Sequence, residues 1–163
     1  MEKFNAYNYF KLISEEMPEL QGFEYGRSAD RDNLVDIVQQ ARLGDAFFSL
    51  DDTDNGRVVH LHGGYFDRRV YVLFLLKKFT MRAGDTMGNS ARVLDECRVI
   101  FHKTISKLIH DKSLSLSGLD YMNENFDYYE LPLELFPEAA GLYFMITVDH
   151  PLNLCYRDLW PQP

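Results

Sequence analysis

The clearest pattern of apolar and polar positions along the chain lies in residues 85–112. Apolar side chains recur there every three or four positions, which places them on one side of an α-helix. They are Met87, Ala91, Leu94, Cys97, Phe101, Ile105 and Leu108. The pattern predicts an amphipathic helix roughly 40 Å long, because each helical residue adds about 1.5 Å. The helix begins either at Asp85, a suitable N-cap, or near Asn89 and Ser90, since Gly88 weakens the first turn.

An unbroken apolar segment precedes this helix and is the natural cover for its apolar face. Residues 70–76 read Val-Tyr-Val-Leu-Phe-Leu-Leu, a composition typical of a central strand. The strand extends over residues 65–80, which is long enough to imply a bend, a bulge or an exposed arm.

Shorter patterns predict the other elements. Two helices are expected at residues 5–17 and 30–42, with an extended stretch at 22–25 between them. Residues 46–50 and 58–61 are predicted to form a hairpin across the acidic turn 51–56. An edge-like strand is expected within 119–131 and a central strand at 141–148.

These elements define an α+β fold with a mostly antiparallel sheet packed against a long central helix. We expect one domain over residues 1–163, with a helical N-terminal segment (1–44), the sheet with its long helix (46–148) and a C-terminal tail (149–163). Apolar residues make this tail unlike a disordered end, so it must dock on its own chain or on a neighbour.

The net charge and the N-terminal sequence limit which partners and which location the protein is expected to have. Seventeen basic and twenty-five acidic side chains give a net charge of −8, which disfavours nucleic acid. The chain begins without a signal-peptide pattern and has no membrane-spanning apolar run, so we expect it in the cytoplasm or assembled into a particle, away from membranes. Cys97 and Cys155 are expected to be reduced.

Candidate metal ligands occur in the predicted hairpin. Asp51 and Asp54 lie in its turn, and His60 and His62 share one face of a strand. The turn follows the first positions of a calcium-binding loop, but His62 stands where that loop requires a closing Glu. An acidic turn and surface histidines explain these residues better, and we expect no cofactor.

The sequence lacks the usual catalytic motifs, so we expect a protein that is not an enzyme. There is no nucleophile elbow, no phosphate-binding loop and no dinucleotide-binding glycine triplet. Aromatic residues make up 14% of the chain, and Tyr and Trp are favoured at subunit interfaces. Together with the projecting strand, they predict an interface formed by Tyr65, Phe66, Arg68, Arg69, Leu152, Leu154, Tyr156, Leu159 and Trp160.

The order of elements over residues 46–148 resembles a known structural family. It is carried by the apolar strand 70–74, by Leu94 and Phe101 on the helix, and by the strand 141–146. In this order the chain resembles the tail-terminator and head-to-tail joining proteins of tailed phages. The resemblance implies a ring of identical subunits, commonly sixfold, in which arms and edge strands pack on neighbours and on other tail or particle proteins. It also implies a negative inner surface that DNA passes without sticking.

Two alternatives to a non-catalytic, self-assembling structural protein remain. One is a small-molecule or divalent-metal-binding domain that uses Asp51, Asp54, His60 and His62. The other is an adaptor that binds another chain by strand addition at an exposed sheet edge.

Overall fold

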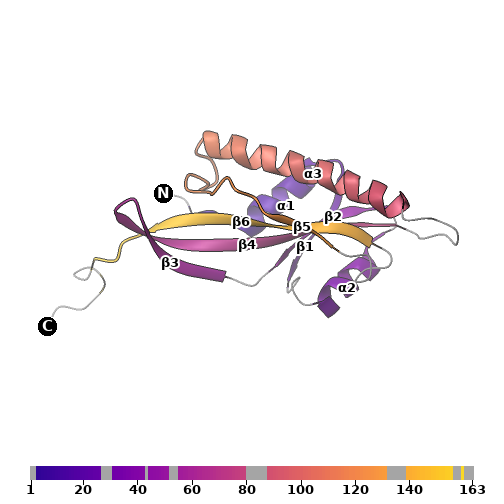
Figure 1. Ribbon diagram of the computed structural model, residues 1–163, viewed down its shortest axis with the longest axis horizontal. Coiled ribbons are helices and arrows are strands. Elements are labelled where there is room, and N and C mark those ends of the chain that lie inside the picture. The colour runs from indigo at the N-terminus through magenta and orange to yellow at the C-terminus, as the bar shows by residue number, and fades with distance from the viewer. Residues whose placement is uncertain are drawn as a thin grey trace.

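The computed structural model describes residues 3–26, 31–42, 44–51, 55–79, 88–131, 139–155 and 159 (Figure 1). Its helices are α1 (Ala6–Glu16), α2 (Arg31–Gln40) and α3 (Gly88–Ser113). Its strands are β1 (Leu20–Gly26), β2 (Ala46–Asp51), β3 (Asn55–Leu61), β4 (Gly64–Lys78), β5 (Tyr128–Glu130) and β6 (Ala139–Leu152). The predicted helices and the extended stretch before α2 are therefore present, as is the long strand.

One six-stranded sheet, in the order β1-β2-β4-β6-β5, contains all the strands, with β3 also on β4. Strand β4 pairs with β6 without interruption from Tyr65↔Leu152 to Lys78↔Ala139. Only β1 and β2 run parallel, and the other pairings are antiparallel. The α+β class with a mostly antiparallel sheet is thus confirmed.

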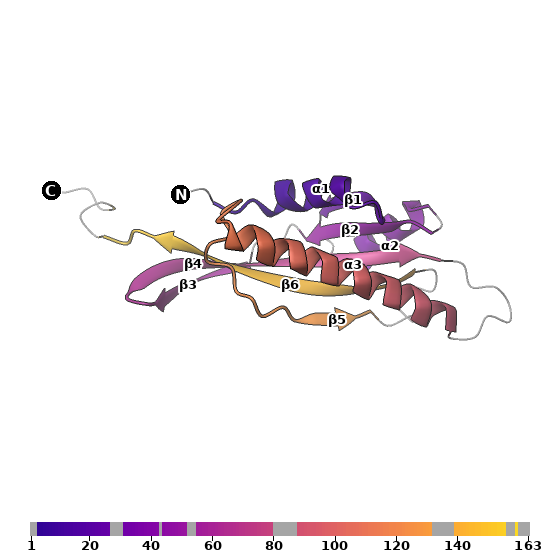
Figure 2. The same cartoon turned by 90° about the horizontal axis from the view of Figure 1, so that it is seen from above.

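The helices cover both faces of the sheet, with α1 and α3 on one face and α2 on the other (Figures 1 and 2). Beneath α1 and α3 the core is aromatic, since Phe10 of α1 contacts Phe48 of β2 and Phe101 of α3 contacts Phe144 of β6. Beneath α2 the core is smaller and gathers Val38, Phe47, Phe74 and Leu76. The described residues include no helix long and apolar enough to cross a membrane.

The buried side of α3 is rotated from the predicted one. Cys97, Phe101 and Leu108 are buried as expected, but Ala91 is exposed and Leu94 and Ile105 are only half-buried. The buried stripe instead follows Ser90, Val93, Cys97, Ile100, Thr104, Leu108 and Asp111. Because three of these residues are polar, the pattern of apolar positions did not identify this stripe as the buried side. Thr104 satisfies its own hydroxyl by donating to the Ile100 carbonyl at 2.9 Å.

The predicted hairpin between residues 46–50 and 58–61 is wrong. Strands β2 and β3 do not pair with each other; both lie along the same edge of β4, where Leu50 faces Leu73 and Asn55 faces Val70. The pairing of β2 ends at Leu50 and that of β3 begins at Asn55, so the two strands continue one another along β4 as one side of a long hairpin. Its turn is His62-Gly63, where φ is 50° and 78°. Both residues need the left-handed conformation of a tight two-residue turn.

Two further boundaries differ at the C-terminal side. Strand β6 extends to Leu152, so residues 149–152 belong to the sheet and not to a tail. Of the predicted strand in 119–131 only Tyr128–Glu130 is regular, at the sheet edge as expected. The segment before it is attached to β6 by local contacts, such as the Asn123 amide donating to the Thr147 carbonyl at 2.9 Å. Asp85 and Met87 lie outside the described residues.

Replacing Phe101 by Ala should lower the free energy of unfolding by about 3–5 kcal/mol, because the ring is 4% exposed and fills the space between α3 and the sheet. Val99 on the same helix is 53% exposed, so Val99→Ala should change stability by less than about 0.5 kcal/mol. Denaturant titration measures both. Equal losses would mean that α3 packs by another side.

Gly141 tests the contact between β6 and β4. An added Cβ would lie 2.1 Å from the Leu75 carbonyl oxygen, whereas at Gly26 it would meet nothing within 4 Å. Gly141→Ala should therefore lower the free energy of unfolding by about 3 kcal/mol or more, since the backbone must move, while Gly26→Ala has a small effect. Thermal or chemical unfolding of both variants is the measurement. A stable Gly141→Ala protein would contradict this strand packing.

Candidate functional site

A projecting arm is the main surface that the sheet presents away from its helices. It consists of β3, the first half of β4 and the end of β6, and it extends beyond the C-terminal end of α3 (Figures 1 and 2). On one side of the arm, cross-strand pairing aligns His60 with Tyr65, and Tyr65 with Leu152. Val58 and Tyr65 are 58% and 49% exposed there. The arm thus presents apolar side chains to its surroundings.

Internal ion pairs hold the arm together. Arg68 of β4 donates two hydrogen bonds to the carboxylate of Asp149 on β6, at 2.7 and 2.8 Å. These bonds raise the pKa of the Arg68 guanidinium above its usual value. Arg69 pairs with Asp67 at 2.7 Å, and the ring of Phe66 lies 5.4 Å from that of Tyr121. Of the predicted interface residues, Phe66, Arg68 and Arg69 therefore have contacts within the subunit, while Tyr65 is the most exposed of the four on the arm.

The predicted tail residues divide between the strand and the chain beyond it. Leu152 ends β6, while Leu154 and Leu159 are 44% and 58% exposed. Tyr156 and Trp160 lie outside the described residues, so docking of the tail stays a prediction. Cys155 is a free, exposed thiol. Cys97 is free and buried, and burial raises its pKa to about 12, so it serves as an apolar core residue.

The structure separates the candidate metal ligands. Asp51 is buried at the end of β2, Asp54 lies outside the described residues, and His62 is in the hairpin turn. His60 lies near the tip of the arm, with its ring 4.9 Å from that of Tyr65. Asp51 and His60 lie beside opposite ends of the first half of β4, and at about 3.3 Å per residue they are roughly 25 Å apart. Within the described ranges, no three His, Cys, Asp or Glu residues form a group that could hold a metal ion.

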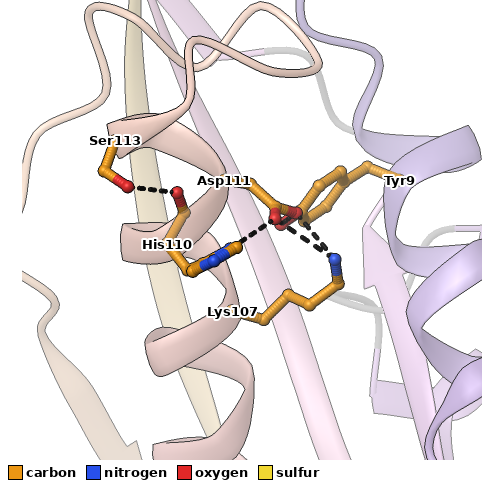
Figure 3. Close-up of polar contacts among 5 residues, drawn as sticks. All are labelled: Tyr9, Lys107, His110, Asp111 and Ser113. Carbon is orange, nitrogen blue, oxygen red and sulfur yellow. Dashed lines mark hydrogen bonds and ion pairs between the residues drawn. The ribbon is translucent and has the colours of Figure 1, made fainter.

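A polar cluster that the sequence did not suggest connects α1 to α3 (Figure 3). Asp111 of α3 is 4% exposed and accepts a hydrogen bond of 2.8 Å from the Tyr9 hydroxyl of α1. Lys107 donates to both carboxylate oxygens of Asp111 at 3.0 and 3.2 Å, and His110 Nδ1 lies 3.3 Å away. The only sequence signal for this cluster was an acidic residue three positions after the buried Leu108.

The electrostatics of this cluster suit a clamp between helices. Burial alone raises the pKa of Asp111, but hydrogen bonds from Lys107, Tyr9 and His110 outweigh it and hold that pKa below its ordinary value. Burial, followed by the bond to Asp111, raises the pKa of Tyr9, so the phenol stays protonated and acts as a donor. The carboxylate is thus fixed between the two helices, and Tyr9 cannot act as a base near neutral pH.

Comparison with known proteins does not assign the chain to a family. No protein-family model matches the chain, and no curated protein has a significantly similar sequence. The chain is therefore defined by its fold, an α+β protein with a mixed sheet and a projecting three-stranded arm.

Removing the Tyr9 hydroxyl tests the clamp. Tyr9→Phe should lower the free energy of unfolding by about 1–3 kcal/mol, because it takes one hydrogen bond from a buried carboxylate. Tyr128→Phe, which changes a tyrosine that is 42% exposed, should stay within about 0.5 kcal/mol. Chemical denaturation measures both, and equal effects would argue against a clamp.

Acid provides a second readout of the same cluster. The folded pKa of Asp111 is depressed, so its contribution is present above the unfolded value of about 3.9 and is lost as pH falls through the folded pKa. Asp111→Asn should be less stable at neutral pH and should lose less stability on acidification than the unchanged protein. Parallel acid unfolding curves would contradict the assignment.

Proposed function

We propose that the protein is a non-catalytic structural subunit that assembles with copies of itself into a ring, in a phage-tail-like or injection-machine-like particle. The observation that carries this proposal is the arm, a braced three-stranded ribbon with exposed apolar side chains. Monomeric proteins seldom project such side chains on a rigid extension, whereas subunit interfaces favour them at their buried centre. Before assembly such a subunit would reside in the cytoplasm.

Open strand edges support the same proposal. Among the described strands, β3 pairs only with β4, so its outer edge keeps backbone groups available to another chain. At the far edge of the sheet, β5 presents Tyr128 and Tyr129, which are 42% and 49% exposed. Because arm and β5 are different surfaces, contact between them would be heterologous. Heterologous contacts close into rings when the rotation between subunits allows it.

Charge supports the particle role that the resemblance implies. A net charge of −8 gives a ring of such subunits a strongly negative total, and a negative channel repels the phosphate backbone. DNA would then move through the ring with little adhesion. Contacts to other particle proteins belong to this proposal as well.

The open edge of β3 also favours a second candidate, an adaptor that binds another protein by strand addition. An extended segment of a partner would pair with the backbone of β3, and side-chain pockets beside it would give specificity. The two candidates differ in the identity of the chain at this edge. The ring requires a second copy of this protein, whereas the adaptor stays monomeric until its partner is present.

A charge placed on the arm tests the self-assembly proposal. Val58→Lys puts a cation on the exposed side of β3 opposite Asp67, where the fold tolerates it but a dry interface does not. We expect the unchanged protein to form a closed oligomer in native mass spectrometry and light scattering, and Val58→Lys to weaken assembly at least about tenfold.

Val99→Lys is the matched control, because Val99 is 53% exposed on α3, away from the arm. It should assemble like the unchanged protein. Thermal unfolding verifies that both variants are folded. A strictly monomeric protein at high concentration, or equal assembly of the two variants, would contradict the proposal.

A further inference from the structure

An open pocket of about 410 Å³ lies where the start of α1 meets the base of the arm. Strands β1, β2, β4 and β6 each contribute side chains to it, together with the segment that leads into α1. The volume is within the range of small-molecule sites, which is roughly 300–1,000 Å³. Of its polar groups, Asp67 and Arg69 form an ion pair of the arm, whereas neither the arm nor the helix clamp accounts for Lys3 and His150.

His150 is the first group that points to a ligand. It lines the pocket from β6, is 9% exposed, and makes no hydrogen bond with any described residue. Since no described residue forms a hydrogen bond with it, both ring nitrogens are available to a ligand in the pocket. Burial lowers the pKa of His150, which keeps the ring neutral near pH 7 with one donor and one acceptor.

The start of α1 provides two more unused donors. The Asn5 side chain accepts the Asn8 amide at 3.0 Å, and the Asn5 carbonyl accepts the Tyr9 amide at 3.0 Å. The amides of Ala6 and Tyr7, which also line the pocket, have no partner in the described part of the chain. No acidic residue occurs in the first turn to offset the positive end of the helix. These amides are oriented as in helix-terminal anion sites.

Charged and aromatic side chains define the rest of the pocket. Lys3 adds a cation beside the helix start, Arg69 is paired with Asp67, and Asp51 is a buried lining residue at the end of β2. Phe4, Tyr7, Tyr25 and Tyr71 provide aromatic walls, and the rings of Tyr7 and Tyr25 meet edge to face at 5.2 Å. Because the carboxylates of Asp51 and Asp67 repel an anion, the negative group of a ligand is favoured near Lys3 and α1. The aromatic rings suit a ligand with a flat apolar body.

We infer that this pocket binds a small planar molecule carrying one oxyanion group, with the phosphate or carboxylate held by the amides of Ala6 and Tyr7 and by Lys3. His150 contacts the ligand between the oxyanion and the ring. The pocket lies at the base of the arm, on the sheet face that also carries Val58 and Tyr65, but ligand binding there does not require the proposed assembly.

Nuclear magnetic resonance titration tests the inference with two anions and their neutral counterparts. The pairs are adenosine monophosphate with adenosine, and benzoate with benzamide. We expect at least one anion to shift the amide signals of Ala6 and Tyr7 saturably, while its neutral counterpart binds at least about tenfold more weakly. Binding of the nucleotide alone identifies a phosphate ligand, and binding of benzoate alone a carboxylate.

Two substitutions and a control complete the test. Lys3→Gln should weaken anion binding about tenfold by removing one charge-assisted contact, and His150→Gln should weaken it as well. Arg92→Gln makes the same change of charge on an exposed position of α3 and should leave binding unchanged. The inference fails if neither anion gives a saturable shift, if the neutral molecules bind equally, or if Arg92→Gln weakens binding as much as Lys3→Gln.

Discussion

Continuous pairing of β4 with β6 is the constraint on which the rest of the structure depends. The two strands stay in register from Tyr65↔Leu152 to Lys78↔Ala139, a span that serves two purposes. The part nearer Lys78, with Leu73, Leu75 and Phe144, carries the core that α1 and α3 cover. The part nearer Tyr65 continues past α3 and becomes the arm. A shift of one residue would turn every core side chain toward the other face, so the buried half fixes the geometry of the exposed half.

Strong local periodicity explains which parts of this fold were predictable from the sequence. The apolar run 70–76 identified β4, and the alternation in 141–148 identified β6 as central. The predicted hairpin failed because an Asp-rich stretch with Asn-Gly is typical of a turn, while the actual turn, His62-Gly63, carries a weaker signal. Two strands that follow one another along the same edge of a third leave no periodic trace in a single sequence. Only pairing with β4 reveals that β2 and β3 share one edge.

Tertiary contacts also explain what was missed at the candidate sites. The buried stripe of α3 contains Thr104 and Asp111, whose polar groups are satisfied by the Ile100 carbonyl and by Tyr9. A prediction from hydrophobic positions alone therefore assigned the wrong buried side to this helix. His150 was not predicted as a site residue, because nothing in the sequence places it beside the start of α1. The length of the predicted strand 65–80 indicated that part of it projects, which is confirmed. The division of the arm residues into braced and exposed side chains required the pairings of Arg68 with Asp149 and of Phe66 with Tyr121.

A rigid arm is what connects the fold to assembly, since a flexible extension would lose conformational entropy on binding and present no fixed surface. Amide hydrogen exchange along β4 measures this rigidity directly. The β4–β6 pairing predicts that protection in the core part of β4, residues 73–76, continues through the arm part, residues 65–71. Exchange in the arm at the rate of an unstructured peptide, with protection only in the core, would contradict the account.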